Sequence, residues 1–426
     1  MAGVTEPVWV THAARHAHAA PIKAHENVDV AVVGGGIMGL TSAFHIARNG
    51  MSVHVVDAGR IGEGASGLNG GQVIPGLKYD PEWLAAHFGG TRGEALIQFA
   101  AGTADAVFDL IGQENLDVPH NRNGWIQACH TELAMDAARM RHRQWAARGA
   151  DVALLDASEI EKLIGTSNYH GGFLDRRAGV INPLAFTFEL ARIGEAAGAK
   201  ITENKECRKL EKSGDGWTLT LASGETIRAG KVILATNAYS GNLVPGLAQS
   251  LVALHSFQIA TEPLAERAAR DILPEGQAVS DSRRILVYYR RTADNRLILG
   301  GRGRMSMPRR ADDWAHLEHA MARLFPSLSE AKIEKRWFGR VAMTPDHLPH
   351  IHEPEKGLVT IVGCQGRGVG LMTAAAKRLV DYLSTGDPDA LPLPITPIQP
   401  IPFHRFRRIG AAALIAWYRM LDAIEQ

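Results

Sequence analysis

The chain has 426 residues, of which 46% are apolar and 21% are charged. At ~150 residues per domain, this length predicts two or three domains with enough apolar residues for a substantial core. The 46 basic and 45 acidic residues leave a net charge of +1. This balance excludes a nucleic-acid binder that neutralises phosphates and also excludes an acidic disordered chain.

The cysteines and the two ends of the chain bear on its environment. Cys129, Cys207 and Cys364 are too far apart for a disulfide framework or a zinc motif, so we expect a reducing compartment and a cytoplasmic protein. Residues 1–21 lack the apolar run of a secretory signal, and we expect a flexible arm there. The apolar stretch Ile409–Tyr418 is far shorter than the ~20 residues that span a bilayer.

A glycine-rich turn follows the first apolar run. Val28–Val33 predicts a strand, and Gly34-Gly35-Gly36-Ile37-Met38-Gly39 then matches the pattern GxGxxG. A helical pattern follows, and Ser52–Val56 resumes as a strand that ends at Asp57 and Ala58. The order strand, turn, helix, strand and acid is typical of a dinucleotide-binding unit.

The residue types in this turn suit a dinucleotide. Gly34 allows the tight turn, Gly36 lets the backbone approach a pyrophosphate, and Gly39 lets the helix pack closely on the strand. The positive N-terminus of the helix favours phosphate. Asp57 suits an adenosine ribose and repels the 2′-phosphate of NADP. The alternative is a glycine turn in an ordinary βαβ unit.

Two further glycine-rich segments bear on the choice between FAD and NAD. The first is Gly62-Glu63-Gly64-Ala65-Ser66-Gly67-Leu68-Asn69-Gly70-Gly71-Gln72, which can lie against a flat ligand or form a flexible surface loop. The second is Cys364-Gln365-Gly366-Arg367-Gly368-Val369-Gly370, between the apolar run Leu358–Gly363 and a helical pattern. An NAD enzyme does not need a second junction of strand, glycine and helix, so this favours FAD.

The sequences GGGIMGL and GEGASGLNGGQ resemble the FAD-binding segments of the D-amino-acid oxidase, glycine oxidase and sarcosine oxidase superfamily. They are most similar to its gamma-glutamylputrescine oxidase-like branch, which has arginine where this chain has Leu68. The resemblance implies that Cys207 binds adenine through its backbone and that Ala235-Thr236-Asn237 lies beside the cofactor. It also implies that Gly366–Gly370 lies against the flavin, where a helix N-terminus favours the anionic reduced form.

The expected cofactor is therefore FAD. It is expected to be non-covalent, because the segment Trp337–Pro349 lacks the cysteine through which sarcosine-oxidase-like relatives attach FAD. The residues expected to bind it are Gly34, Gly36, Ile37, Met38, Gly39, Asp57, Ala58, Gly64, Ala65, Ser66, Asn69, Gly70, Gly71, Gln72, Cys207, Ala235, Thr236, Asn237, Gly366, Arg367, Gly368, Val369 and Gly370.

Several further segments have strand character. Three of them predict an antiparallel insertion: Lys205–Leu210, Trp217–Ala222 and Glu225–Ala229. Lys231–Thr236 then predicts a separate buried strand. Four others predict an antiparallel sheet in a second domain over the flavin: Gly124–His130, Leu251–Glu262, Arg284–Tyr289 and Arg296–Gly301.

The resemblance places a substrate-contacting tyrosine at Tyr288 or Tyr289. Side chains alternate along a strand, so one of the two faces the flavin, and alignment favours Tyr289; the alternative is that both pack within the sheet. Arg367 is expected either to contact flavin or substrate or to point to water.

Two departures from the superfamily narrow the chemistry. Amino-acid oxidases carry WxGLRPxT, whose arginine pairs with the substrate carboxylate. Val341 occupies that position here, and Arg340 is expected on the other face of the strand. An amine or N-substituted amino acid is therefore a better candidate than a small free amino acid. Ile298 replaces a lysine that assists oxygen activation in relatives, so O2 and another electron acceptor both remain open.

Three other features have ordinary alternatives. The histidines near His350 lack the carboxylate or cysteine complement of a metal site, so no metal is expected. The proline-rich stretch from Ala390 leads to an apolar helix that is expected to pack on its own domain rather than to contact a membrane surface. One basic group could dock a carboxylate-bearing substrate tail or be a solvated loop: Arg302, Arg304, Arg309 and Arg310.

Together these features predict a two-domain α/β flavoprotein with a discontinuous Rossmann-like FAD-binding domain and an α+β substrate domain with an antiparallel sheet. The FAD domain is assigned to residues 26–89, 181–245 and 337–388. The substrate domain is assigned to 90–180 and 246–336, and the connector and C-terminal helix to 389–426.

The reaction implied by the resemblance is oxidation of a C–N bond in a gamma-glutamylputrescine-like amine. The substrate passes a hydride to flavin N5, and the imine that forms is hydrolysed. Tyr289 and Arg367 are the residues expected to take part. The alternatives are an FAD dehydrogenase subunit that reduces a protein or quinone, a hydroxy-acid oxidase, and a non-catalytic flavin-bound tethering protein.

Overall fold

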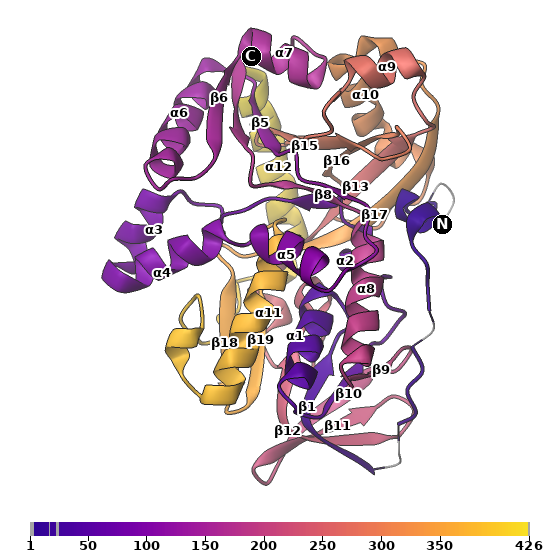
Figure 1. The fold of residues 1–426 in the computed structure, drawn as a ribbon, viewed down its shortest axis with the longest axis vertical. Coiled ribbons are helices and arrows are strands. Elements are labelled where there is room, and N and C mark those ends of the chain that lie inside the picture. The colour runs from indigo at the N-terminus through magenta and orange to yellow at the C-terminus, as the bar shows by residue number, and fades with distance from the viewer. Residues whose placement is uncertain (1–3, 17, 23–24, 425–426) are drawn as a thin grey trace.

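The computed structural model describes residues 4–16, 18–22 and 25–424. Two large sheets dominate them, one in the lower half and one in the upper half of Figure 1. A small third sheet joins β3 (Gln72–Val73), β8 (Gly179–Ile181) and β4 (His120–Asn121). The division of the chain into domains at the residue boundaries given above stays a prediction.

The first sheet has parallel strands at its centre. Its order is β10-β11-β12-β1-β2-β9, and β19 pairs with both β12 and β18. The pairs of β1 with β12 and β2, of β2 with β9, and of β12 with β19 are parallel. The strands are β1 (His25–Val33), β2 (Val53–Val56), β9 (Lys200–Thr202), β10 (Cys207–Ser213), β11 (Gly216–Leu221), β12 (Thr226–Leu234), β18 (His350–Glu355) and β19 (Leu358–Val362).

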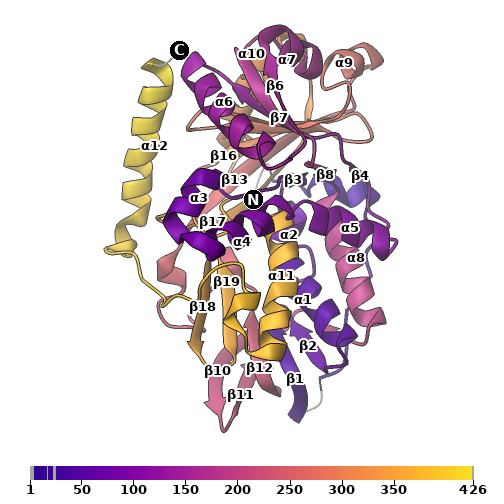
Figure 2. The same ribbon diagram turned by 60° about the vertical axis from the view of Figure 1, so that its left-hand side comes forward.

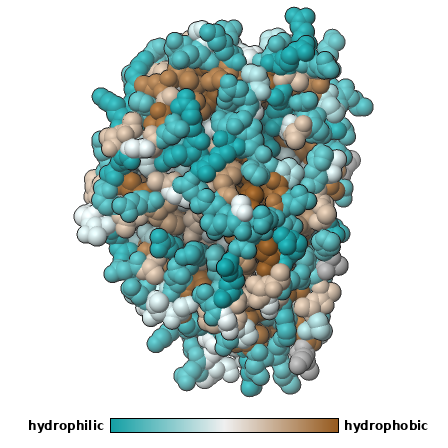
Figure 3. Space-filling view, in the orientation of Figure 1, coloured by the Kyte–Doolittle hydropathy of each residue, from teal (hydrophilic) through white to brown (hydrophobic). Residues whose placement is uncertain are grey.

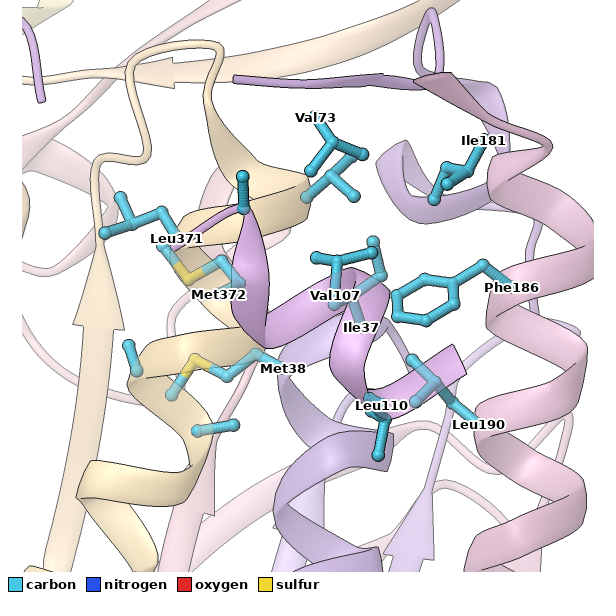
Figure 4. Close-up of a cluster of buried hydrophobic side chains, with 14 of the residues drawn as sticks. Ile37, Met38, Val73, Val107, Leu110, Ile181, Phe186, Leu190, Leu371 and Met372 are labelled. Atoms are coloured by element: carbon cyan, nitrogen blue, oxygen red, sulfur yellow. The ribbon is translucent and has the colours of Figure 1, made fainter. Parts of the chain in front are cut away.

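Apolar runs and covering helices explain this sheet. Every residue of β2 and β19 is buried, as expected for parallel strands covered on both faces. Helix α1 (Ile37–Arg48) packs against both α8 (Pro183–Ala196) and α11 (Gly368–Thr385). Figure 4 shows Ile37, Met38 and Met372 inside this cluster with side chains from α5 and α8. Full burial of each large apolar side chain contributes ~1.5–3 kcal/mol.

One strand differs from the sequence prediction. The third strand of the expected insertion and the following buried strand form a single strand, β12, which passes through Gly230 without a break. The long strand β1 pairs with it from His25 opposite Thr226 to Val33 opposite Leu234. This continuous ladder of hydrogen bonds outweighs the glycine that suggested a boundary.

The second sheet contains the predicted substrate-side strands. Its order is β17-β13-β16-β15-β14-β5-β7-β6. The four predicted strands are confirmed as β5, β13, β15 and β16, but the sheet is not entirely antiparallel, because β14 and β5 pair in parallel. The bounds are β5 (Trp125–Cys129), β6 (Val152–Asp156), β7 (Gly171–Asp175), β13 (Val252–Thr261), β14 (Ala278–Asp281), β15 (Val287–Arg291), β16 (Leu297–Arg302) and β17 (Ile333–Met343).

The remaining helices lie on the outside of the two large sheets and between them (Figures 1 and 2). They are α2 (Ala65–Leu68), α3 (Pro81–Phe88), α4 (Gly90–Ala101), α5 (Asp105–Gln113), α6 (Glu132–Ala146), α7 (Ala157–Ile164), α9 (Glu266–Asp271), α10 (Ala315–Leu324) and α12 (Arg407–Ile424). In the part of the chain that the structure describes, no single helix is long and apolar enough to cross a membrane. One pair of helices in this part, α4 and α5, is long and apolar enough only when the two are taken together, and the pair is bent by 52°.

The N-terminal arm is packed against the molecule rather than loose. Trp9 is 3% exposed, and its Nε1 donates to the carbonyl of Asn69 at 3.0 Å. Asn182 Nδ2 in turn donates to the carbonyl of Trp9 at 3.1 Å. The expectation of a flexible arm is therefore wrong for the described part of this segment, because one buried tryptophan fixes it.

The C-terminal helix is confirmed, but it leaves apolar side chains uncovered. Helix α12 runs along one side of the molecule in Figure 2. Ile409 and Trp417 are 70% and 53% exposed. The face shown in Figure 3 is mainly hydrophilic, with an apolar patch near its middle, about where α5 lies in Figure 1.

Candidate active site

A large cavity lies between the two main sheets. Its volume is about 1,100 Å³, and its lining includes Val33 and Val56 from the first sheet and Trp125, Ser256 and Tyr288 from the second. Pockets for single small ligands span ~300–1,000 Å³. The cavity therefore has room for a large cofactor with a second molecule beside it.

The first glycine turn fits a dinucleotide. Gly36 precedes α1 without a side-chain cap, and a Cβ on Gly36 would lie 2.7 Å from Ser66 Oγ. Gly36 itself places no side chain over the α1 terminus, where, within the described residues, only the N–H of Ile37 is taken, by Ser66 Oγ, so the terminus can receive an anion as phosphate binding requires. Asp57 at the end of β2 is held in place, because its carboxylate accepts from the backbone N–H of Gly35 at 2.7 Å and of Gly59 at 2.8 Å.

The second glycine-rich segment forms one wall of the cavity rather than a loose surface loop. Asn69 Nδ2 donates to the carbonyls of Ala65 and Ser66 at 3.1 and 2.8 Å, and its Oδ1 accepts from Gly71 N–H at 2.8 Å. Ser66 Oγ accepts from the N–H of Ile37 at 2.9 Å. These bonds join the segment to the start of α1.

Asn237 connects two segments that are far apart in the sequence. Its Oδ1 accepts from Gly363 N–H at 3.0 Å, and its Nδ2 lies 3.3 Å from Cys364 Sγ. The turn after β12 is thereby held against the junction that leads into α11. Arg367 precedes α11 without a side-chain cap, so this helix N-terminus is also available to a ligand.

Most of the residues predicted to bind the cofactor line this cavity. They are Gly34, Gly36, Ile37, Met38, Asp57, Ala58, Gly64, Ala65, Ser66, Asn69, Gly70, Gln72, Cys207, Ala235, Thr236, Asn237, Gly366, Arg367, Gly368 and Val369. Their binding of FAD stays a prediction.

Three predicted glycines do not line the cavity. A Cβ on Gly39 would lie 1.9 Å from the carbonyl oxygen of Gly34, and one on Gly71 would lie 2.2 Å from that of Ile181. A Cβ on Gly370 would lie 2.8 Å from the carbonyl oxygen of Thr103, which comes shortly before α5 in the chain. These glycines allow close packing of the segments that form the site.

The structure reverses the expected choice between the two tyrosines. Tyr288 lines the cavity and its hydroxyl lies 2.8 Å from Ser256 Oγ. Tyr289 is fully buried in the other face of the sheet, where its hydroxyl donates to Tyr169 Oη at 3.1 Å. The alternation along β15 puts Val287 and Tyr289 in the core. Burial raises the pKa of Tyr288 to about 12, so its hydroxyl stays protonated.

Three positive side chains meet at the upper wall of the cavity; we call Lys78, Arg141 and Arg367 the cation cluster. Arg141 lies on α6, Arg367 precedes α11, and Lys78 follows β3. Arg367 Nη1 donates to the carbonyl of Pro75 at 2.6 Å, and its guanidinium lies 5.7 Å from the ring centre of Trp125. The guanidinium therefore contacts the cavity wall instead of extending into bulk water.

The cations influence one another. Burial, and then the charge of Arg141, lowers the pKa of Arg367 to about 10. The side chain of Lys78 is exposed towards the open cavity. Desolvation by the surrounding protein lowers its pKa, and the positive charges of Arg367 and Arg141 lower that pKa further. Lys78 and Arg141 carried no motif; only the tertiary arrangement of β3, α6 and α11 identifies them.

Other expectations about the substrate side have mixed outcomes. Val341 lines the cavity as expected, but so does Arg340, whose guanidinium lies 5.0 Å from the ring centre of Tyr239. Ile298 is fully buried in the core and does not line the cavity. The basic loop group also lies outside the lining: Arg302, Arg304, Arg309 and Arg310.

The one cavity cysteine beside the second junction is a weak nucleophile. Burial raises the pKa of Cys364, and hydrogen bonding to Asn237 only partly opposes this effect. The thiol is therefore the dominant form, whereas a thiolate is the reactive one. Within the described residues, no group of three or more histidine, cysteine, aspartate or glutamate side chains is arranged to hold a metal ion.

Comparison with known proteins identifies the family. The model of the family described as FAD dependent oxidoreductase matches residues 29–382. The chain belongs to this family. It is therefore an FAD-dependent oxidoreductase, and FAD is its cofactor.

This FAD-dependent oxidoreductase is similar to proteins along nearly its whole length. It is 31% identical over 399 residues to the probable oxidoreductase OrdL of Rhizobium meliloti (strain 1021), covering 92% of each chain. It is also 31% identical over 401 residues to the gamma-glutamylputrescine oxidoreductase of Escherichia coli (strain K12), covering 93% of each.

The fold is shared with solved structures. Glycine oxidase from Geobacillus kaustophilus superposes with a TM-score of 0.72 at 22% identity, covering 88% of this chain and 99% of that one. The α/β architecture with a Rossmann-like FAD-binding part, predicted from the glycine motifs, is thereby confirmed.

Proposed function

We propose that this FAD-dependent oxidoreductase oxidises a C–N bond of a gamma-glutamylputrescine-like amine or of an N-substituted amino acid. The observation that carries the proposal is Val341, an apolar side chain in the cavity wall where amino-acid oxidases of the superfamily carry an arginine. A small free amino acid lacks its usual carboxylate partner at position 341, and the neighbouring Arg340, which also lines the cavity, lies with its guanidinium against the Tyr239 ring. The similarity to the gamma-glutamylputrescine oxidoreductase of Escherichia coli (strain K12) supports the same substrate class.

The chain's own residues support this chemistry by position and charge. Bound FAD supplies a two-electron acceptor. Trp125 and Tyr288 provide walls of the cavity on the side of the second sheet. The cation cluster lowers the pKa of a nearby substrate ammonium, and the neutral amine is the form that can lose a hydride from its α-carbon. The imine that results adds water and releases a carbonyl compound together with ammonia from a primary amine, or with the remaining amine from an N-substituted substrate.

We also propose that FAD is bound non-covalently, through the glycine-rich segments that line the cavity. The raised pKa of Cys364 supports this, since a thiol attacks poorly. Heating the purified protein should release FAD into the supernatant after precipitation. Flavin that stays with the denatured chain would contradict non-covalent binding.

The substrate class is tested by anaerobic bleaching of the flavin. We expect gamma-glutamylputrescine to bleach the absorbance of the holoenzyme, whereas glycine and hydroxy acids leave it unchanged at equal concentration. Bleaching by hydroxy acids alone would replace the proposal with a hydroxy-acid oxidase. No bleaching by any amine, amino acid or hydroxy acid would favour a non-catalytic flavoprotein.

A second candidate is a dehydrogenase that passes electrons to a protein or quinone instead of to O2. The resemblance favours it, because relatives carry an oxygen-activating lysine where this chain has Ile298, which is buried in the core and gives the cavity no lysine at this position. Stopped-flow reoxidation separates the two: fast reoxidation by air defines an oxidase, and slow reoxidation by air with fast reoxidation by a quinone-like dye defines a dehydrogenase.

A further inference from the structure

The cation cluster has more positive charge than its surroundings neutralise. Asp80 is the carboxylate that pairs with it, accepting from Arg141 Nε at 2.7 Å and Nη2 at 3.2 Å. The hydrogen bond of Arg367 goes to a neutral carbonyl, that of Pro75. No hydrogen bond or ion pair joins Lys78 to another residue in ranges 4–16, 18–22 and 25–424.

The other carboxylates near the cluster are already engaged. Asp175 pairs with Arg177 through two bonds of 2.9 and 2.6 Å. Asp281 lines the cavity but pairs with Arg283 at 2.9 Å. Three cations against the single carboxylate of Asp80 leave an excess of two positive charges on one wall. Arg141 and Arg367 are only partly exposed, and charges partly withdrawn from water are normally paired, so this wall is suited to an anionic ligand.

The position of the cluster separates it from the site expected for the FAD pyrophosphate. The start of α1 follows β1, an interior strand of the first sheet, whereas Arg141 lies on α6, which packs beside β5 of the second sheet. Figure 1 shows α6 and β5 in the upper half and α1 in the lower half. The cluster is therefore placed to contact a molecule that lies between the cofactor segments and the second sheet.

We propose that Lys78, Arg141 and Arg367 bind a carboxylate of the substrate, so that the substrate is an amine that carries a carboxylate. This inference rests on the proposed function and assigns the specificity to this wall instead of to position 341. Arginine forks and a lysine ammonium suit a planar carboxylate. The basic loop around Arg304, which lies outside the cavity lining, has no part in it.

Lys78 gives the sharpest test, since its replacement breaks no hydrogen bond given by the structure. Titration of the FAD-loaded enzyme with acetate should perturb the flavin absorbance with a measurable Kd, whereas acetamide should not. We expect Lys78→Met to weaken acetate binding ~10- to 100-fold, as loss of one charge-assisted bond predicts. Lys78→Arg should restore most of the affinity.

The control variant is Arg304→Gln, which removes a cation of the basic loop outside the cavity lining. It should bind acetate as the unmodified enzyme does. Unchanged acetate affinity in Lys78→Met, or weakened affinity in Arg304→Gln, overturns the proposal. Inorganic phosphate serves as a second probe: a site that binds phosphate but not acetate overturns the assignment to a carboxylate.

The substrate itself supplies a second readout. Half-saturation of anaerobic bleaching by gamma-glutamylputrescine should rise ~10-fold or more in Lys78→Met, whereas the methyl ester of the same amine should be affected little. If no amine bleaches the flavin but acetate binding still depends on Lys78, the proposed function fails and the anion site stands. If amines bleach and acetate binding is independent of Lys78, the anion site fails alone.

Discussion

At the residue scale, Gly36 shows how a single missing Cβ makes room for a cofactor. Its Cβ would enter the space between α1 and Ser66, 2.7 Å from the hydroxyl oxygen. We expect Gly36→Val to lower FAD affinity at least ~10-fold, because the side chain blocks the approach of the pyrophosphate. Equilibrium dialysis or recovery of yellow protein measures this effect.

Gly112 provides the matched control for that substitution. It lies in α5, and a Cβ there meets nothing within 4 Å. Gly112→Ala should therefore retain FAD fully and gain ~0.5–1 kcal/mol of stability from the higher helix propensity of alanine. Full FAD retention by Gly36→Val would show that the pyrophosphate does not lie at this turn.

The two neighbouring tyrosines make a second prediction at this scale. Tyr288→Phe removes a hydroxyl in the cavity, and we expect the half-saturation or rate of flavin bleaching to change ~3- to 10-fold with little loss of stability. Tyr289→Phe removes the buried bond to Tyr169, and we expect a loss of ~1 kcal/mol with unchanged bleaching. Stopped-flow absorbance and urea unfolding separate these outcomes; the opposite pattern would restore Tyr289 as the substrate-side residue.

At the scale of elements, the packing of α1 on α11 leads to a pH dependence. His45 on α1 faces Lys377 and Asp381 of α11, with Arg48 one turn further on. Burial, followed by Lys377, lowers the pKa of His45 to about 4, and Asp381 opposes this shift. As the pH falls, His45 of the unfolded chain therefore takes up a proton near the ordinary histidine pKa of 6.5, well before His45 of the folded chain does.

The sign of the effect follows from linkage. Between pH 6.5 and 4 the unfolded state binds more protons at His45, so stability falls as the pH is lowered through this range. Allowing for solvent screening of the half-buried ring, we expect His45 to account for ~1–2 kcal/mol of the loss between pH 7 and 5. His45→Gln should reduce that loss in urea unfolding, and His319→Gln, at an exposed position, should not. Equal slopes in all three proteins would contradict the assignment.

At the scale of the whole molecule, the cavity couples the two large sheets. Residues of both sheets line it, so we expect FAD to stabilise both together. At a free FAD concentration 100 times Kd, binding adds ~2.7 kcal/mol, which for a chain of this size raises Tm by ~3 °C. Calorimetry should show the whole transition move; two transitions of which only one moves would show that FAD contacts a single sheet.

The sequence alone determined the FAD family and most of the segments that line the cavity. The conformation of turns such as Gly34–Gly39 and Asn69–Gln72 is determined by their own residues, because only small residues tolerate the close approach of another backbone segment or of a ligand. The apolar runs of β1 and β19 likewise identified two strands of the first sheet, and their parallel pairing comes from the structure.

Only the tertiary structure decided which side chains face the substrate. A shift of one residue along β15 decides whether Tyr288 or Tyr289 faces the cavity. When both faces of a sheet are covered, the sequence pattern of the strand does not determine which face each side chain takes. Lys78, Arg141 and Arg367 come from three segments separated by at least sixty residues, and Trp9 was hidden in an arm without periodicity. Their proximity is a property of packing, which a pattern of neighbours in sequence does not contain.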